Sequence, residues 1–258
     1  MALLPNPKSR ALLVDVTRCI GCHACAKACK ESHRLPGNGE ETELDAVTYT
    51  VVLDKGNDRY LRRMCMHCAD PSCASACPVG AFTKTELGPV VYDASKCLGC
   101  RYCMVACPFG VPRYEWSQPV PRVRKCDGCI ERQREGKITA CAEACPAEAT
   151  VAGTREELLA EARRRIAQNP GAYHPEIYGE HEVGGTNVLV LSPVPFEQLG
   201  LKVGLGQEPL PNLTWAALSK IPKVVAAGGI GLSAIYWITH RRQEVAAAEG
   251  RGAEKEIR

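Results

Sequence analysis

The sequence is poor in aromatic residues, which make up 5% of its 258 residues, and neither sign of charge dominates it. Its 32 basic and 29 acidic residues leave a formal net charge of +3, and no basic run is interleaved with aromatic residues. Nucleic-acid-binding surfaces depend on such basic clusters. We therefore expect no nucleic-acid partner for this chain.

Signatures of catalysis are also missing. No Gly-x-Gly-x-x-Gly motif follows a predicted strand, and the nearest match, GGIG at 228–231, lies inside an apolar run. No group of acid, base and nucleophile side chains is recognisable either. The chain is therefore predicted to have no catalytic residues and not to be an enzyme on its own.

Cysteine, by contrast, is abundant. The sixteen cysteines all lie in the first 145 residues and fall into four groups of four. So many cysteines in ordered groups indicate chemistry rather than packing. The groups are Cys19, Cys22, Cys25 and Cys29; Cys65, Cys68, Cys73 and Cys77; Cys97, Cys100, Cys103 and Cys107; and Cys126, Cys129, Cys141 and Cys145.

Three kinds of cysteine chemistry compete to explain these groups. A disulfide framework fits poorly, because disulfide-rich domains are short chains held together by bridges, whereas these cysteines sit in tight runs. Zinc would suit the pairs Cys65/Cys68 and Cys126/Cys129, but a third cysteine three residues on, as at 19–29 and 97–107, is surplus to such a site. Iron–sulfur ligation accounts for all sixteen.

The group at 97–107 carries the clearest signature. It reads C-x2-C-x2-C-x3-C-P, the bacterial ferredoxin spacing, in which the fourth cysteine binds the other cluster of a pair. The group at 19–29 differs only in having Lys30 in place of the proline, and the other two groups have a longer third gap. Four groups of four thiolates predict four [4Fe–4S] clusters as the cofactors.

An internal repeat supports this interpretation. Residues 13–25 align with residues 91–103, which places Asp15 over Asp93 and Gly21 over Gly99. We predict an α+β fold of two tandem bacterial-ferredoxin-like units, each with two clusters surrounded by short β-hairpins and helical turns. Strands are expected at 11–16, 49–53 and 150–151, and a hairpin at 82–92. Surface loops are expected at 30–48 and 132–139, and a short helical turn is expected before each Cys-Pro pair.

The chain changes character after residue 150. A capping box, Thr154 to Glu157, opens a predicted helix with one apolar face, and 184–192 is predicted to form a strand. Residues 224–239 are uncharged, slightly short of the ~20 residues that span a bilayer. A buried core helix is the alternative, but flanking aromatics and the closing Arg241-Arg242 favour a single transmembrane helix.

These features predict four segments. They are a double ferredoxin-like four-cluster domain at 1–152, a helix, strand and docking or linker extension at 153–212, a transmembrane anchor at 213–240, and a polar cytoplasmic tail at 241–258.

The distribution of basic residues bears on location. Five Lys/Arg follow the apolar run and two closely precede it, which places the tail in the cytoplasm and the cluster domain in the periplasm. The N-terminal stretch MALLPNPKSRALLVD has no twin arginine and no apolar core. We therefore expect the chain either to travel with a signal-bearing partner or to keep its cluster domain inside.

Longer motifs connect the chain to a known family. It resembles the four-cluster ferredoxin-like subunits of membrane-bound respiratory oxidoreductases, above all two subfamilies with a C-terminal anchor: the electron-transfer subunit of the hydrogenase-2 type and the β subunit of respiratory formate dehydrogenase. The motifs are CMHCADPSC at 65–73, CRYCMVACP at 100–108, GTREELLAEA at 153–162 and YGEHEVGGTN at 178–187.

The resemblance implies a role and a set of ligands. The role is a one-electron relay between a catalytic subunit, of hydrogenase or molybdopterin type, and a membrane quinone-reactive or cytochrome b subunit. A cluster-based redox sensor or maturation protein is the alternative. The implied ligands are Cys19, Cys22, Cys25 and Cys145 for cluster 1; Cys29, Cys126, Cys129 and Cys141 for cluster 2; Cys65, Cys68, Cys73 and Cys107 for cluster 3; and Cys77, Cys97, Cys100 and Cys103 for cluster 4.

Overall fold

The strands that precede and follow the cysteine-rich region pair in one three-stranded sheet. The structure, a computed structural model, describes residues 5–255, with side chains to residue 250. Strand β1 (Arg10–Asp15) lies at the centre, antiparallel to β8 (Thr150–Thr154) and parallel to β9 (Val188–Leu191). Because β1 is apolar on both faces, it is buried by helices and loops on both sides.

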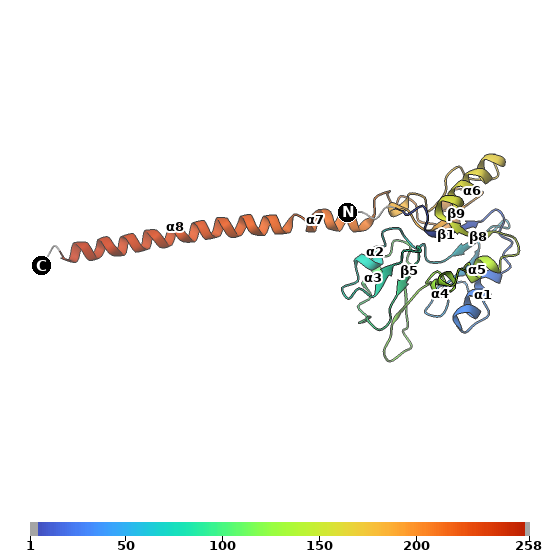
Figure 1. Cartoon of the computed structure of the whole chain (residues 1–258), viewed down its shortest axis with the longest axis horizontal. Helices are drawn as coiled ribbons and strands as arrows, with labels where there is room; N and C mark the ends of the chain where they lie inside the picture. Colours follow the sequence, from blue (N-terminus) through green and yellow to red (C-terminus); the bar gives the residue numbers. More distant parts are fainter. Residues whose placement is uncertain (1–4, 256–258) are drawn as a thin grey trace. The chain divides into compact units, whose positions relative to one another are not determined.

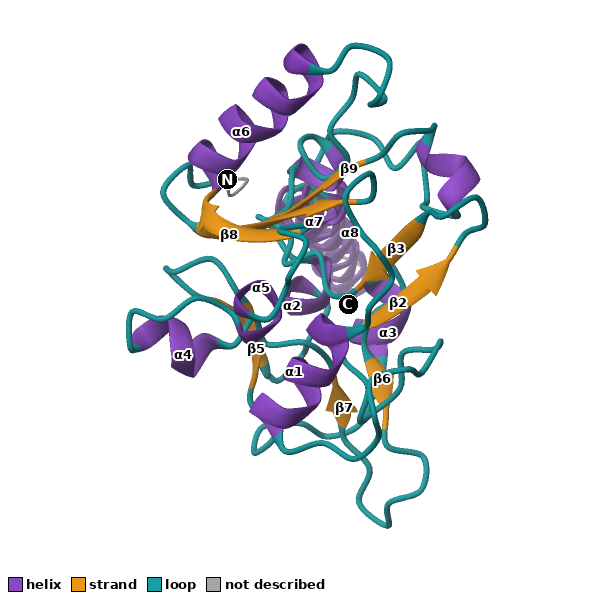
Figure 2. Ribbon diagram, turned by 90° about the vertical axis from the view of Figure 1, so that its right-hand side faces the viewer, coloured by secondary structure: helices purple, strands orange, loops and turns teal. Residues whose placement is uncertain are grey.

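Helix α6 (Arg155–Gln168) covers one face of this sheet, as Figures 1 and 2 show. Leu158 and Ala162 pack against Leu13 and Leu189, all of them buried. The predicted capping box is confirmed: the N–H of Glu157 donates to Thr154 Oγ1, and the N–H of Thr154 donates to the Glu157 carboxylate. The helix thus fixes the sheet at the edge of the cysteine-rich region.

Small hairpins and short helices fill the rest of the cysteine-rich region. The antiparallel hairpins are β2 (Val51–Asp54) with β3 (Tyr60–Arg63), β4 (Phe82–Lys84) with β5 (Val90–Tyr92), and β6 (Arg113–Tyr114) with β7 (Val123–Arg124). The helices are α1 (Ala24–His33), α2 (Ser72–Ser75), α3 (Tyr102–Ala106), α4 (Ile130–Arg134) and α5 (Ala140–Glu143), and short 3-10 turns lie at Glu182–Gly184 and Phe196–Leu199.

Most of the expected local structure is present. The hairpin at 82–92 is confirmed, and α2, α3 and α5 each end one or two residues before a Cys-Pro pair, as predicted. The strand expected over 184–192 is shorter, because the 3-10 turn and two left-handed glycines occupy its first residues. Strands β3, β6 and β7 had not been predicted.

Two loop predictions need correction. Helix α1 continues to His33, and Lys30 is buried because its ammonium donates to Thr48 Oγ1 and to the carbonyl of Pro36 and pairs with Glu41 at 2.9 Å. The surface loop expected at 132–139 likewise begins with the end of α4, whose Gln133 is buried. Both segments are therefore anchored by a polar side chain pointing inward.

The C-terminal part of the chain forms a second unit, from residue 213 onward. Helix α7 (Leu210–Leu218) is followed by α8 (Ile221–Lys255), which Figure 1 shows as one continuous helix. Pro222 is tolerated because it lies in the first turn, where the backbone N–H has no helical partner. Among the described residues, the stretch Leu210–Gly250 is the one helical region long and apolar enough to cross a membrane. The last three residues of the predicted polar tail lie outside the described residues.

A buried ion pair joins β1 to α6. Arg165 Nη1 lies 2.8 Å from Asp15 Oδ2, both side chains are at most 6% exposed, and the Tyr173 hydroxyl donates to the same oxygen. Removing one partner of such a pair leaves an uncompensated buried charge and costs about 3–5 kcal/mol. We expect Arg165→Met to lower the urea midpoint of unfolding strongly, whereas Arg164→Met, which removes an exposed pair with Glu161, changes stability by less than about 1 kcal/mol. Equal midpoints for the two variants would contradict this role of the pair.

Candidate metal centres

The cysteine loops are shaped by glycines in left-handed conformations. Gly99 (φ 77°) and Gly128 (φ 70°) each follow a cysteine by two residues. Their amides donate to the thiols of Cys97 and Cys126, both at 3.4 Å. A side chain at Gly128 would place its Cβ 2.8 Å from Pro89 Cγ, so backbone and neighbour both require glycine there.

Further amides face the cysteines that precede proline. The N–H of Ala81 donates to Cys77 Sγ at 3.2 Å, and the N–H of Thr150 donates to Cys145 Sγ at 3.4 Å. Hydrogen bonds to the sulfurs stabilise added negative charge, and in iron–sulfur sites they raise the reduction potential.

Thiols of different sequence groups lie near enough to raise one another's pKa. Burial raises the pKa of Cys19, and the nearby thiols of Cys145 and Cys22 raise it further. Burial also raises the pKa of Cys25, which Arg62 lowers and the thiols of Cys141, Cys19 and Cys145 raise. The first three cysteines of the first group thus lie beside the last cysteine of the fourth group.

The complementary group combines the fourth group with the end of the first. Burial raises the pKa of Cys126 well above its usual value, and Cys29 and Cys129 add to this effect. Burial raises the pKa of Cys129 to about 11, with a further contribution from Cys141. These thiols therefore lie near one another.

Thiols of the second and third sequence groups affect one another's pKa in the same way. Burial, and then the thiols of Cys65 and Cys107, raise the pKa of Cys73 to about 12. Burial, and then Cys100 and Cys77, raise the pKa of Cys103 to about 11. Each of these groups therefore includes the fourth cysteine of the other sequence group.

The donor chemistry of these groups fits iron–sulfur clusters. Burial raises the pKa of these thiols by more than the neighbouring cations lower it, and bound iron would lower it further, because the thiolate is the metal-binding form. Cysteine thiolates are the ligands that hold [4Fe–4S] clusters in ferredoxins.

Buried cations lie around the thiols. Arg62, which is 4% exposed, bonds Thr50 and Thr150 and has the thiols of Cys25 and Cys141 nearby. Lys84 donates to the carbonyl of Cys68, and burial lowers its pKa to about 8. Four thiolates carry four negative charges, so buried cations beside them offset part of that charge.

Lys125 adds another such cation. It is 6% exposed and donates to the carbonyl of Cys126 at 2.8 Å. Lys30 and Lys125 are thus both buried with backbone carbonyls as partners. Arg62 and Lys84 were missed, because nothing in the local sequence marks an arginine or lysine as buried.

A histidine and an aspartate also lie beside the thiols. His33 Nε2 is 2.9 Å from Asp127 Oδ1, and its Nδ1 lies 2.9 Å from the carbonyl oxygen of Cys29. The hydrogen bond to Asp127, followed by that to Cys29, raises the pKa of His33 to about 11. His33, Asp127 and Cys129 lie close enough to hold a metal ion, but Cys129 belongs to a group already described. His33 follows Cys29 by one helical turn, and that spacing is the signal that could have identified it.

The two histidines between cysteines differ in their surroundings. The backbone amide of Val90 donates to Nδ1 of His67, which is buried. Burial, with Lys125 and Lys84 nearby, holds the pKa of His67 well below its usual range. His23 is partly exposed and hydrogen-bonds the carbonyl of Gly39.

The fold and these sulfur groups define a ferredoxin-like iron–sulfur protein. Residues 57–155 match the family model of the 4Fe-4S dicluster domain. The chain is 44% identical over 264 residues to a protein of Nitratidesulfovibrio vulgaris, which covers 96% of this chain and 71% of the relative. It is 39% identical over 242 residues to the hydrogenase-2 operon protein HybA of Shigella flexneri, a match that covers 76% of this chain and 74% of the relative. It is 33% identical over 261 residues to the formate dehydrogenase iron-sulfur subunit of Haemophilus influenzae, a match that covers 90% of this chain and 83% of the relative.

The chain belongs to this family of [4Fe–4S] electron-transfer subunits, whose members are not the catalytic subunits of their complexes. The suspected resemblance is thereby confirmed, as are the [4Fe–4S] cofactors and the electron-transfer role. These relatives do not favour the alternative of a cluster-based redox sensor or maturation protein.

Proposed function

We propose that the sixteen cysteines bind four [4Fe–4S] clusters in the crossed sets that the resemblance implies. The mutual effects of the thiols on their pKa values support every set, because each involves the fourth cysteine of the paired sequence group. When bound, each cluster takes up and releases a single electron. The protein supplies four thiolates to each, which leaves no iron open to substrate.

We infer that the four proposed sets follow one another in a line. Cys25 of cluster 1 has Cys141 of cluster 2 as a neighbour whose charge raises its pKa. Cys65 of cluster 3 acts in the same way on Cys126 of cluster 2. Cys103 of cluster 4 acts on Cys73 of cluster 3. The effects of these thiols on one another are the single observation that supports this order and the proposed relay.

The crossed sets correspond to two ferredoxin-like units within 1–152. Matching turns support this tandem arrangement: the Asp15 carboxylate accepts from the amide of Thr17, and the Asp93 carboxylate accepts from the amide of Ser95. His23 and Arg101, which align in the repeat, are both in the left-handed conformation. The proposed division of the chain also includes the extension at 153–212, the anchor at 213–240 and the tail at 241–258.

Both ends of the line reach the surface. At cluster 1, Cys22 is exposed and Ile20 is 61% exposed. At cluster 4, Tyr102 and Val105 are 61% and 86% exposed, and Trp116 lies beneath the guanidinium of Arg101. Exposed apolar side chains of this kind mark surfaces that partners cover.

We infer that the chain relays electrons between a catalytic subunit, of hydrogenase or formate dehydrogenase type, and a quinone-reactive or cytochrome b subunit in the membrane. The names of the two relatives supply the first partner. The apolar helical region 210–250 supplies the attachment to the membrane. The small residues at 227–233 suit packing against another membrane helix. The basic residues after the span favour a cytoplasmic tail and a periplasmic cluster domain.

The test is to solubilise the native complex in mild detergent and to identify the subunits that co-purify. Hydrogen and formate are then offered separately, and reduction of the clusters is followed by EPR. We expect one of the two to reduce all four clusters, with hydrogen favoured by the higher identity to the hydrogenase-2 operon relative. If neither reduces them while dithionite does, both partner assignments fail and only the relay remains.

A further inference from the structure

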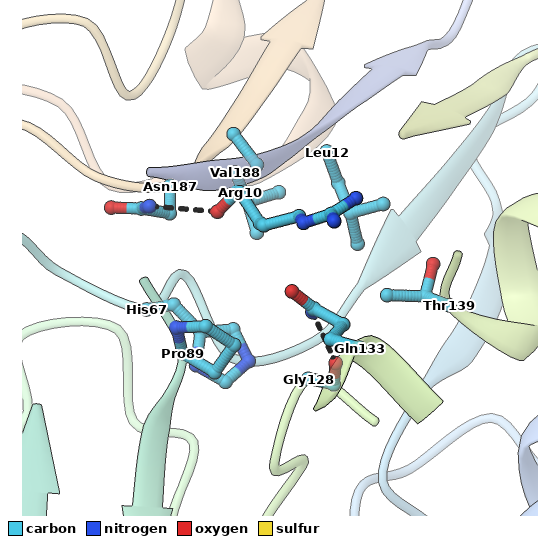
Figure 3. A pocket seen from close by; sticks show the side chains of 10 residues that line it. Arg10, Leu12, His67, Pro89, Gly128, Gln133, Thr139, Asn187 and Val188 are labelled. Carbon is cyan, nitrogen blue, oxygen red and sulfur yellow. Dashed lines mark hydrogen bonds between the residues drawn. The ribbon is translucent and has the colours of Figure 1, made fainter. Parts of the chain in front are cut away.

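A small cavity lies between the loops that carry the proposed ligands of clusters 2 and 3. Its volume is about 20 Å³, and its walls include His67, Pro89, Gly128 and Gln133. Figure 3 shows His67 and Gln133 facing it from opposite sides. His67 lies between the cluster 3 ligands Cys65 and Cys68, and Gly128 lies between two ligands of cluster 2.

Two buried polar atoms border this cavity without a hydrogen-bond partner among the described residues. They are Nε2 of His67 and Oε1 of Gln133, and their residues are 4% and 6% exposed. A buried polar group that lacks a partner costs about 1–3 kcal/mol. Two such atoms at one cavity therefore point to a ligand that satisfies both.

The hydrogen-bond roles of these atoms are fixed by their other contacts. Nδ1 of His67 accepts from the amide of Val90 at 2.9 Å, so the ring proton is on Nε2, which is a donor. Nε2 of Gln133 donates to the carbonyl of Gly128 at 2.6 Å, so the free atom, Oε1, is an acceptor. One side of the cavity thus offers a donor and the other an acceptor.

A water molecule has the matching chemistry, because it can accept from one group and donate to another. A cavity of at least about 10–15 Å³ can hold one water when it offers two or more polar partners. We propose that an ordered water molecule accepts a hydrogen bond from His67 Nε2, donates one to Gln133 Oε1, and joins the ligand loops of clusters 2 and 3 across the gap that electrons cross. This inference rests on the proposed ligand sets.

The bridge bears directly on electron transfer. Electrons tunnel more efficiently through covalent and hydrogen bonds than across van der Waals gaps. The path from cluster 3 through His67, the water and Gln133 to the Gly128 loop contains hydrogen bonds at every break in the covalent chain. His67 and Gln133 are therefore positioning residues for the step between the two halves of the relay.

The first test is a structure of the purified, cluster-loaded complex at a resolution that shows ordered water. The expected result is density within hydrogen-bond distance of both His67 Nε2 and Gln133 Oε1. The guanidinium of Arg10 also lines the cavity, and finding it bonded to Gln133 Oε1 would overturn the proposal, as would a cavity free of density. The same structure shows the cluster ligands separately, so a failure of the ligand sets is distinguishable from a failure of the water site.

The second test measures electron redistribution between the clusters after flash reduction of the complex by a photoexcited ruthenium dye. We expect Gln133→Met and His67→Phe to slow the step between clusters 2 and 3 by the same factor. The double variant should be no slower, because both substitutions remove one shared bridge. His67→Gln, whose amide nitrogen can take the place of Nε2, should restore part of the rate.

Two controls make these kinetics specific to the bridge. The number of intact clusters in each variant is counted by Mössbauer spectroscopy, and Gln133→Met, which is not adjacent to a ligand, carries the test if His67→Phe loses cluster 3. Unchanged rates in a fully loaded Gln133→Met complex would overturn the proposal. So would a double variant slower than either single one, because the two effects would then be independent.

Discussion

The double variant Cys65→Ala/Cys107→Ala is expected to keep three of the four clusters, whereas Cys100→Ala/Cys107→Ala keeps two. Under the crossed assignment, Cys65 and Cys107 bind the same cluster, so the second substitution destroys nothing further. Cys100 and Cys107 bind different clusters although only seven residues separate them. The iron in intact cubane clusters, measured by Mössbauer spectroscopy, should therefore be about three quarters and about half of that in the parent chain.

The opposite pattern would contradict the crossed sets. If Cys107 binds together with its sequence neighbours Cys97, Cys100 and Cys103, the Cys100/Cys107 variant keeps three clusters and the Cys65/Cys107 variant keeps two. A matched control is Cys77→Ala/Cys100→Ala, which under the crossed assignment removes cluster 4 alone. Counting intact clusters, rather than total iron, is needed because a cubane that loses one ligand can retain three of its irons.

The ligand groups could be predicted from the sequence because they depend on local spacing. The C-x2-C runs, the left-handed glycines between cysteines and the helical turns before each Cys-Pro pair are all set by neighbouring residues. The capping box at Thr154 is local in the same way. Such features persist whatever the rest of the fold does.

The polar interior could not be predicted, because it depends on partners far away in the chain. Arg165 is 150 residues from its partner Asp15, and Lys125 is held by the carbonyl of Val90, which belongs to a different hairpin. The sequence pattern of an exposed basic residue is the same as that of a buried one with a distant partner. Charged residues are rarely buried without such partners, so a surface position was the natural expectation.

The short strands could not be predicted from the sequence for a related reason. β6 and β7 are two residues each, too short to show an alternating pattern, and they pair only because Arg113 and Arg124 are brought opposite each other. Helix α4 begins inside a cysteine group, after Cys129 in the left-handed conformation. Its single turn matters, because it carries Gln133 inward to the loop of cluster 2.

A chain truncated after Asn212 is expected to appear in the soluble fraction with its clusters in place, whereas the full chain sediments with membranes. The boundary follows the division of the chain into two units. The apolar part of the helical region 210–250 is not buried within the protein. In water this exposed apolar surface would be costly, and in a bilayer it is stabilising, so the helix should carry the membrane affinity of the chain when it is expressed without partners.

A single substitution tests the same anchor without removing any part of the chain. Arginine at the centre of a membrane helix costs about 2.5–3.5 kcal/mol, or roughly a hundredfold in partitioning. Ile230→Arg should therefore move much of the chain into the soluble fraction, whereas Val245→Arg, beyond the closing arginines of the same helix, should not. The comparison separates insertion from adhesion, because a helix that merely lies on anionic lipid would bind more tightly with either added positive charge. Equal behaviour of the two variants would mean that the apolar stretch does not enter the bilayer, and the membrane attachment would then have to come from a partner subunit.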